Sequence, residues 1–210
     1  MKHDVINMNS HISNQGLNMQ IAKQCAPLLT GIKISNILIT SSSNKEKVME
    51  IFCNSSIWYK EIYRENGRTT FFLYNPKKLM EYLQRPEIKR LMSALGYKNI
   101  DIESVLEVFS SRFCEYMRER ELFPHEMGLL LGYPIADVVG FIEQKGKNSL
   151  YSGYWKVYSD LQGAHNTFDQ YRSAKETVMQ LVTEGISIKR IVMLYHTANN
   201  ISDLHQLFAV

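Results

Sequence analysis

The sequence is poor in cysteine, and its three cysteines, Cys25, Cys53 and Cys114, stand far apart. Three widely spaced residues form neither a disulfide framework nor a metal-binding knuckle. The histidines also lack the spacing of metal ligands; they are His3, His11, His125, His165, His196 and His205. We therefore expect reduced thiols in a cytoplasmic protein, and no structural zinc or iron–sulfur site.

The sequence also lacks a long apolar run and a large charge of one sign. No stretch approaches the ~18 consecutive apolar residues of a membrane-spanning helix. The first 15 residues contain no apolar segment of a secretory signal. The formal net charge is only +3, which is too small to indicate a nucleic-acid or membrane binder. We expect no membrane partner.

What remains is the composition of an ordinary globular protein, with 210 residues, 45% of them hydrophobic and 21% charged. Residues 1–13 are polar and without periodicity, which predicts a flexible tail. Residues 14–196 are expected to form a single α+β domain, and 197–210 a C-terminal extension.

Strand signals are clearest in the first half of the chain. Residues 35–41 form a β-branched run typical of a buried strand. Two further strand patterns flank Asn66-Gly67, the dipeptide that supplies the positive φ angles of a type I′ hairpin. The aromatic segment 149–159 predicts a fourth strand.

Helix signals fill the remainder of the chain. A first helix is expected near residues 15–26, ended by Pro27. Pro76, Pro86 and Asp101 stand where helices begin, and more helices follow to about residue 195. The expected fold class is α+β, with a small, mostly antiparallel sheet (one Asn-Gly hairpin plus two further strands) covered by helices.

Three features between residues 123 and 159 bear on function. His125 and Glu126 follow Pro124, and a His beside a Glu suggests acid–base chemistry. The second His of an H-E-x-x-H zinc motif is absent, however, because residue 129 is Leu. Helix-start chemistry explains the same residues, since Pro favours the first position and an acid complements the helix dipole.

The second feature is a helix-turn-helix spacing over residues 125–146, with Gly132 in the turn. The start of its second helix, Ile135 to Asp137, presents no Arg, Asn or Gln to a base edge, and Asp137 would face phosphates. The sequence therefore disfavours nucleic acid as a partner.

The third feature is a basic, aromatic segment, residues 144–159, which contains three lysines and no acid. Its charge equals that of the whole chain. Lysines around a glycine, next to aromatic faces, suit a ligand with a phosphate or carboxylate group. The alternative is that Gly146 ends a helix and the aromatics are core. The candidate ligand-binding residues are Lys145, Lys147, Asn148, Trp155, Lys156 and Tyr158.

Cys25 is a further candidate, as a nucleophile, although a lone cysteine is usually a small buried hydrophobe.

Four segments of the sequence also resemble one bacterial family, catalogued as the domain of unknown function numbered thirty-seven ninety-three and found mainly in anaerobic Gram-positive bacteria. The segments are QCAPLLTGIK (24–33), FPHEMGLLLGYP (123–134), DVVGFIEQKGKN (137–148) and GYWKVY (153–158).

The resemblance covers roughly residues 20–195 and implies a single cytosolic domain, without implying an activity or a cofactor. Family members often have His where this chain has Gln24, and Cys where it has Ser152. A mechanism that needs a His next to Cys25, or the second thiol as a metal ligand, is therefore in doubt for this chain.

The first hypothesis for function is a cytosolic domain that binds a ligand or partner through the segment 145–158. The second is an enzyme that uses His125 and Glu126, or Cys25. The third is a helix-turn-helix-like regulator. The sequence leaves the cofactor, substrate, reaction and oligomeric state open.

Overall fold

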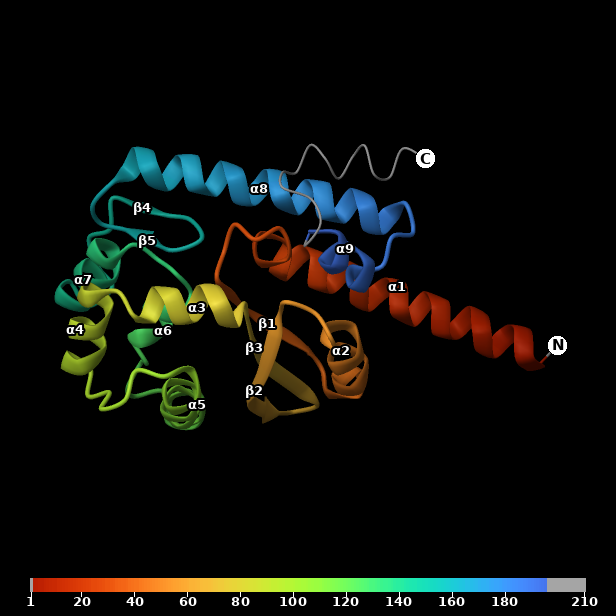
Figure 1. The fold of residues 1–210 in the computed structure, drawn as a ribbon, viewed down its shortest axis with the longest axis horizontal. Helices are drawn as coiled ribbons and strands as arrows, with labels where there is room; N and C mark the ends of the chain where they lie inside the picture. The colour runs from red at the N-terminus through yellow and green to blue at the C-terminus, as the bar shows by residue number, and fades with distance from the viewer. Residues whose placement is uncertain (1, 196–210) are drawn as a thin grey trace.

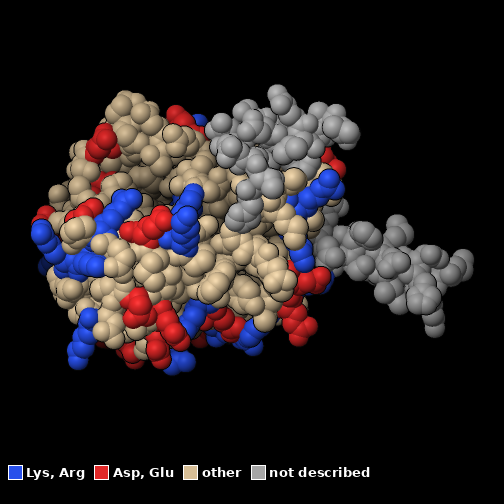
Figure 2. Space-filling view, in the orientation of Figure 1, with Lys and Arg blue, Asp and Glu red and all other residues tan. Residues whose placement is uncertain are grey.

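The computed structural model describes the backbone of residues 2–195 and the side chains of residues 16–195. Helices pack on both faces of a small antiparallel sheet (Figure 1), which confirms the predicted α+β class. On the face seen in Figure 2, acidic and basic side chains are interspersed, and a group of Lys and Arg side chains lies over the end that carries α4 and α7. The predicted extension, 197–210, lies outside the described residues.

The sheet has three strands in the order β1-β3-β2: β1 (Ser35–Ser41), β2 (Trp58–Glu65) and β3 (Arg68–Tyr74). The predicted Asn-Gly hairpin is confirmed, because Asn66 (φ 49°) and Gly67 (φ 71°) both have the positive φ of a type I′ turn. The central strand β3 is buried on both faces, with Phe71 in one core and Phe72 in the other. This explains the run of apolar residues from Phe71 to Tyr74.

The helices begin mostly where the sequence predicts. Asp101 accepts a hydrogen bond from the Ser104 N–H at 2.8 Å, and Pro76 and Pro86 occupy first turns. The helices are α1 (Lys2–Leu29), α2 (Lys45–Phe52) after a short 3₁₀ turn η1 (Ser42–Asn44), α3 (Pro76–Leu83), α4 (Pro86–Ala94), α5 (Ile102–Glu119), α6 (Glu126–Leu130), α7 (Ile135–Glu143), α8 (Leu161–Thr183) and α9 (Ile188–Tyr195).

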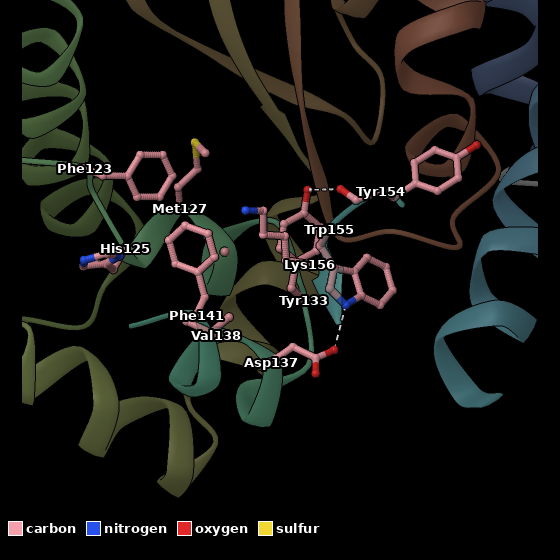
Figure 3. Close-up of a pocket in the computed structure, with 11 residues that line it drawn as sticks. Phe123, His125, Met127, Tyr133, Asp137, Val138, Phe141, Tyr154, Trp155 and Lys156 are labelled. Atoms are coloured by element: carbon pink, nitrogen blue, oxygen red, sulfur yellow. Dashed lines mark hydrogen bonds between the residues drawn. The ribbon is translucent and has the colours of Figure 1, made fainter. Parts of the chain in front are cut away.

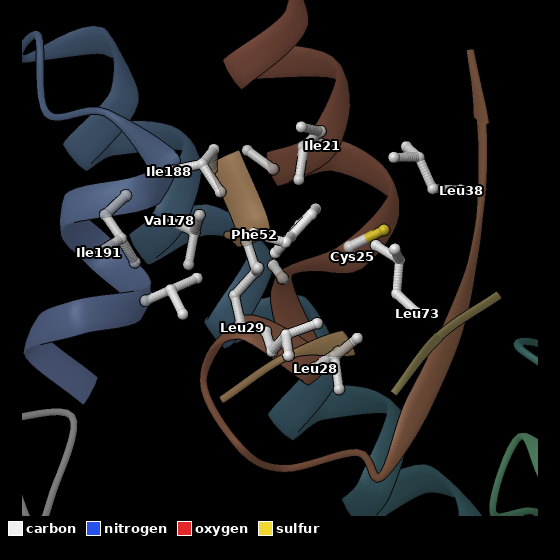
Figure 4. Close-up of a cluster of buried hydrophobic side chains, with 14 of the residues drawn as sticks. Ile21, Cys25, Leu28, Leu29, Leu38, Phe52, Leu73, Val178, Ile188 and Ile191 are labelled. Carbon is white, nitrogen blue, oxygen red and sulfur yellow. The ribbon is translucent and has the colours of Figure 1, made fainter. Parts of the chain in front are cut away.

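The first helix differs from the prediction at both ends. It begins at Lys2, so most of the range predicted to be a flexible tail, 1–13, is helical, and it continues past Pro27 to Leu29. Pro27 lies in the last turn, where it removes one backbone hydrogen bond. Burial of Ile21, Cys25 and Leu29 against the sheet and other helices stabilises the helix despite that loss (Figure 4).

The predicted fourth strand also differs. The segment 149–159 bends into a hairpin of two very short strands, β4 (Tyr151–Ser152) and β5 (Lys156–Val157), that pair only with each other. The bend turns Trp155 into a small core, where it packs with Phe168 and Tyr171 of α8.

Three clusters of buried side chains hold these layers together. One lies between α1, α8, α9 and one face of the sheet, and the second lies between the other face and α3 to α7. The third is the small core beneath the β4–β5 hairpin. Among the described residues, no helix has the length and apolar character needed to cross a membrane.

Candidate functional site

A pocket of about 230 Å³ lies between α6, α7 and the β4–β5 hairpin (Figure 3). Five aromatic side chains line it, namely Phe123, Tyr133, Phe141, Tyr154 and Trp155. Three residues that the sequence singles out also line it: His125, Trp155 and Lys156. The structure therefore brings two of the three sequence features together, and we call this cavity the aromatic pocket.

Asp137 fixes one wall of the aromatic pocket. Its buried carboxylate accepts hydrogen bonds from the Trp155 indole N–H (2.7 Å), the backbone N–H groups of Tyr158 (2.8 Å) and Ser159 (3.0 Å), and the Ser159 hydroxyl (2.8 Å). Four donors satisfy the charge, and they tie the hairpin to the first turn of α7. Asp137 is therefore buried against the hairpin and does not lie on the outer face, where a helix-turn-helix would place it toward phosphates.

The Trp155 ring is held by contacts on several sides. It stacks on Tyr133, with centroids 5.2 Å apart and an angle of 27° between the rings. Phe168 meets it edge-on at 4.5 Å, and the Tyr133 hydroxyl donates to the Tyr154 carbonyl oxygen at 3.3 Å. These contacts make a preformed aromatic surface.

Lys156 lies at the edge of the aromatic pocket. Its ammonium donates to the Gly146 carbonyl oxygen at 2.5 Å, so the β4–β5 hairpin contacts the loop after α7. In Figure 3 the ammonium points across the pocket toward Met127 and Phe141. One N–H of Lys156 is engaged by Gly146, and an ammonium has three.

The loop 145–148 uses its backbone N–H groups to end α7. The N–H groups of Gly146 and Lys147 donate to carbonyl oxygens of α7 and its end, those of Phe141 (2.8 Å) and Gln144 (2.9 Å). Gly146 (φ 70°) thus ends the helix. Lys145, Lys147 and Asn148 are exposed and do not line the pocket.

Tyr158 also lies outside the lining of the aromatic pocket. It packs against α7 at Gly140, where an added Cβ would lie 2.6 Å from the Tyr158 Cβ. Its backbone N–H, rather than its ring, serves the site, through the hydrogen bond to Asp137.

His125 and Glu126 face different surroundings although they are neighbours. The imidazole of His125 packs near Phe123 (5.6 Å) and Phe141 (5.9 Å), and its Nδ1 is buried without a hydrogen-bond partner among the described residues. The buried Glu126 carboxylate instead accepts from the Tyr97 hydroxyl (3.0 Å) and Arg112 (3.2 Å). Glu126 is therefore an ion-pair residue of the core, and the two residues do not form an acid–base pair.

Cys25 is fully buried on the sheet side of α1. Burial raises the pKa of its thiol to about 12, although the Asn36 amide and Lys33 act in the opposite direction. The thiol therefore stays protonated at neutral pH, as in a structural cysteine. This environment does not favour a nucleophile.

The two positions at which this chain differs from the pattern of the family that it resembles, Gln24 and Ser152, lie on separate elements, α1 and β4. The Gln24 amide pairs with the backbone of the edge strand β1, accepting from the Ile39 N–H (2.9 Å) and donating to its carbonyl oxygen (3.0 Å). Ser152 is exposed in β4. Gln24 thus extends the hydrogen bonding of the sheet edge.

The helix pair α6 and α7 gives no support to base recognition. Helix α6 has only five residues. On α7, Asp137 is buried, and Ala136 and Glu143 are exposed, so the outer face carries no Arg, Asn or Gln for a base edge.

Metal-ligating groups are scattered in the part of the chain that is described. Among side chains 16–195, no three His, Cys, Asp or Glu residues lie together so that they could hold a metal ion. His3, His11, His196 and His205 fall outside this range. The expectation of no metal site stays a prediction.

Comparisons with known proteins identify one match. No curated protein and no solved structure matches the chain. A family model, described as "Protein of unknown function (DUF3793)", matches residues 21–192. This span contains α2 to α8, both hairpins and all residues that line the aromatic pocket. The chain therefore belongs to the DUF3793 family, as the four sequence segments predict.

Proposed function

We propose that this chain is a cytoplasmic small-molecule-binding domain. Its ligand has a planar, apolar body that occupies the aromatic pocket and one carboxylate or phosphate group that contacts Lys156. The observation that carries the proposal is the pocket itself, a preformed cavity with five aromatic walls and one ammonium group. Ligand sites are typically apolar cavities with a few well-placed polar groups.

The charge balance of the pocket supports an anionic group on the ligand. Two charged side chains line the cavity, Asp137 and Lys156. Four hydrogen bonds satisfy the Asp137 carboxylate, whereas Lys156 donates to a single neutral carbonyl oxygen. The uncompensated charge at the cavity is therefore positive, and a charge-assisted hydrogen bond from Lys156 favours an anion.

The arrangement supports binding over catalysis. A nucleophile needs a base within hydrogen-bond reach, and the candidates are separated: Cys25 is in the core beside α1, and Glu126 pairs with Arg112. In the view of Figure 3 the Phe141 ring lies between His125 and Lys156. The second hypothesis, an enzyme that uses His125, Glu126 or Cys25, has no arrangement that supports it.

Free thiols support a reducing compartment. All three cysteines, Cys25, Cys53 and Cys114, are unpaired. Disulfides are rare in the cytoplasm, where thiols are kept reduced, and they form and persist in exported proteins. This pattern is the basis for proposing a cytoplasmic location.

The proposal is tested by calorimetric titration of the full chain with benzoate, phenyl phosphate and the neutral benzamide. We expect saturable binding of at least one anionic probe, and binding of benzamide at least tenfold weaker. Lys156→Ala should raise the Kd of the anionic probe at least tenfold, because a charged hydrogen bond contributes ~1.5–3 kcal/mol.

Lys147→Ala is the matched control, since Lys147 is an exposed lysine nine positions away that does not line the pocket. This variant should keep the wild-type Kd within twofold. The proposal is contradicted if none of the three probes binds, if benzamide binds as tightly as the anions, or if both lysine variants weaken binding equally.

A further inference from the structure

Lys33 is a buried cation without an acidic partner. It lies in the loop between α1 and β1, and only 7% of the residue's surface is exposed. The ammonium donates to the Asn36 side-chain oxygen at 2.9 Å. It lies 5.3 Å from the centre of the Tyr133 ring and 5.8 Å from that of Tyr171.

This environment is unusual for a lysine. Buried charges are normally paired with an opposite charge, yet none of the ion pairs among the described side chains includes Lys33. Burial lowers the pKa of its ammonium from 10.5 to about 8, and the nearby Cys25 thiol opposes that change. An amide oxygen and two ring faces compensate a full charge only in part.

A second cavity, of about 200 Å³, adjoins Lys33. It lies where the loop after α1 meets the α3–α4 turn, the end of α6 and the side of α8, and its walls include Lys33, Tyr82, Arg85, Gly132 and Tyr171. We call it the Lys33 cavity. It differs from the aromatic pocket in its lining residues, and the Tyr133 ring contacts Trp155 as well as Lys33.

Arg85 and Tyr82 also line the Lys33 cavity. The Arg85 guanidinium is exposed and lies 5.4 Å from the centre of the Tyr82 ring. The Tyr82 hydroxyl is buried without a hydrogen-bond partner among the described residues. No acidic side chain lines the cavity, so its walls carry two positive charges, those of Lys33 and Arg85.

We propose that the Lys33 cavity binds a small oxyanion, a carboxylate or phosphate group, between the Lys33 ammonium and the Arg85 guanidinium. An oxyanion supplies the counter-charge that Lys33 lacks. Arg85 matches either group because its fork of N–H donors fits carboxylate and phosphate geometry. The site is separate from the one in the proposed function.

The test is calorimetric titration of the full chain with inorganic phosphate and, separately, with succinate, against sodium chloride at equal ionic strength. We expect saturable binding of at least one probe by the wild type, and the tighter probe identifies the oxyanion. Lys33→Met and Arg85→Gln should each raise its Kd at least tenfold. Because Arg85 is exposed, Arg85→Gln leaves the fold intact even if Lys33→Met alters it.

Matched controls are Lys77→Met and Arg90→Gln, which change exposed residues of α3 and α4 that do not line the cavity; both should bind within twofold of the wild type. The proposal is overturned if neither probe binds, or if the control variants lose binding as Arg85→Gln does. Loss of binding in Lys156→Ala, with Arg85→Gln unaffected, also overturns it and assigns the anion to the aromatic pocket. Benzoate binding that needs Arg85 but not Lys156 would instead contradict the proposed function alone.

Discussion

Replacing Lys33 by methionine should stabilise the protein at neutral pH. Burial lowers the pKa of Lys33 from 10.5 to about 8, and at about 1.36 kcal/mol per pH unit this difference costs the folded state roughly 3 kcal/mol. Methionine keeps most of the side-chain volume and carries no charge. It loses the hydrogen bond to Asn36, worth about 1 kcal/mol, so the net gain at pH 7 is about 2 kcal/mol.

The effect of Lys33 depends on pH in a defined direction. Below pH 8 the folded and unfolded states both carry the proton, and the folded state bears the full cost of burying it. Between pH 8 and 10.5 the unfolded state binds more protons, so this group makes the free energy of unfolding rise with pH. The advantage of the Lys33→Met variant should therefore shrink by about 3 kcal/mol over this window.

Other groups titrate in the same window, so the difference between the two proteins is the informative quantity. Burial raises the pKa of Cys25 from 9.0 to about 12, which makes stability fall above pH 9 in both proteins. Burial likewise raises the pKa of Tyr133 to about 12. Subtracting the wild-type curve from the variant curve removes the Tyr133 contribution, whereas the Cys25 contribution cancels only in part because Lys33 itself lowers the pKa of that thiol.

The assay is urea unfolding followed by far-ultraviolet circular dichroism at pH 7, 8, 9 and 10. Lys77→Met, at an exposed lysine, should differ from the wild type by less than about 0.5 kcal/mol at every pH. The reasoning is refuted if Lys33→Met is less stable than the wild type by more than about 1 kcal/mol at pH 7. It is also refuted if the stability difference stays constant from pH 7 to pH 10.

Three further predictions concern the supports of the fold. Asp137→Ala should lower the free energy of unfolding by about 3–5 kcal/mol, because it leaves four donors without their acceptor and each unsatisfied buried donor costs about 1–3 kcal/mol, and it should weaken the near-ultraviolet dichroism of Trp155; a loss below about 1 kcal/mol would contradict the four-bond arrangement. Gly140→Ala should cost about 1–3 kcal/mol in urea unfolding, because the new methyl group meets Tyr158; no change would mean that α7 and the hairpin separate freely. Gly67→Ala should cost about 1 kcal/mol by the same measurement, since its φ is 71°, and an unchanged midpoint would argue against the type I′ turn.

Local signals account for the parts of the fold that the sequence predicts. The bounds of β1, 35–41, follow from its β-branched run, and the hairpin follows from Asn66-Gly67 because both signals act within a few residues. The β4–β5 hairpin depends instead on Asp137, which lies 18 positions before Trp155. No local pattern reveals that contact, so the segment resembles a plain strand.

In the candidate sites, too, the sequence reveals individual residues but not their neighbours in space. His125, Trp155 and Lys156 stand out in the sequence by residue type and do line one pocket. Lys33 stands between Ile32 and Ile34 in a largely apolar stretch, the one signal that marks it as a buried charge. Its neighbours in space come from α3, α6 and α8, and their convergence depends on the tertiary fold.

Nuclear magnetic resonance of the two indole N–H groups tests the aromatic pocket most directly. The Trp155 indole lines the pocket and donates to Asp137, whereas Trp58 is 57% exposed on β2 and serves as an internal control. Titration with benzoate or phenyl phosphate should shift the Trp155 indole signal in a saturable manner and leave that of Trp58 in place. A Trp155 signal that stays unmoved with both probes, or a saturable shift at Trp58 alone, would contradict the assignment of the ligand site.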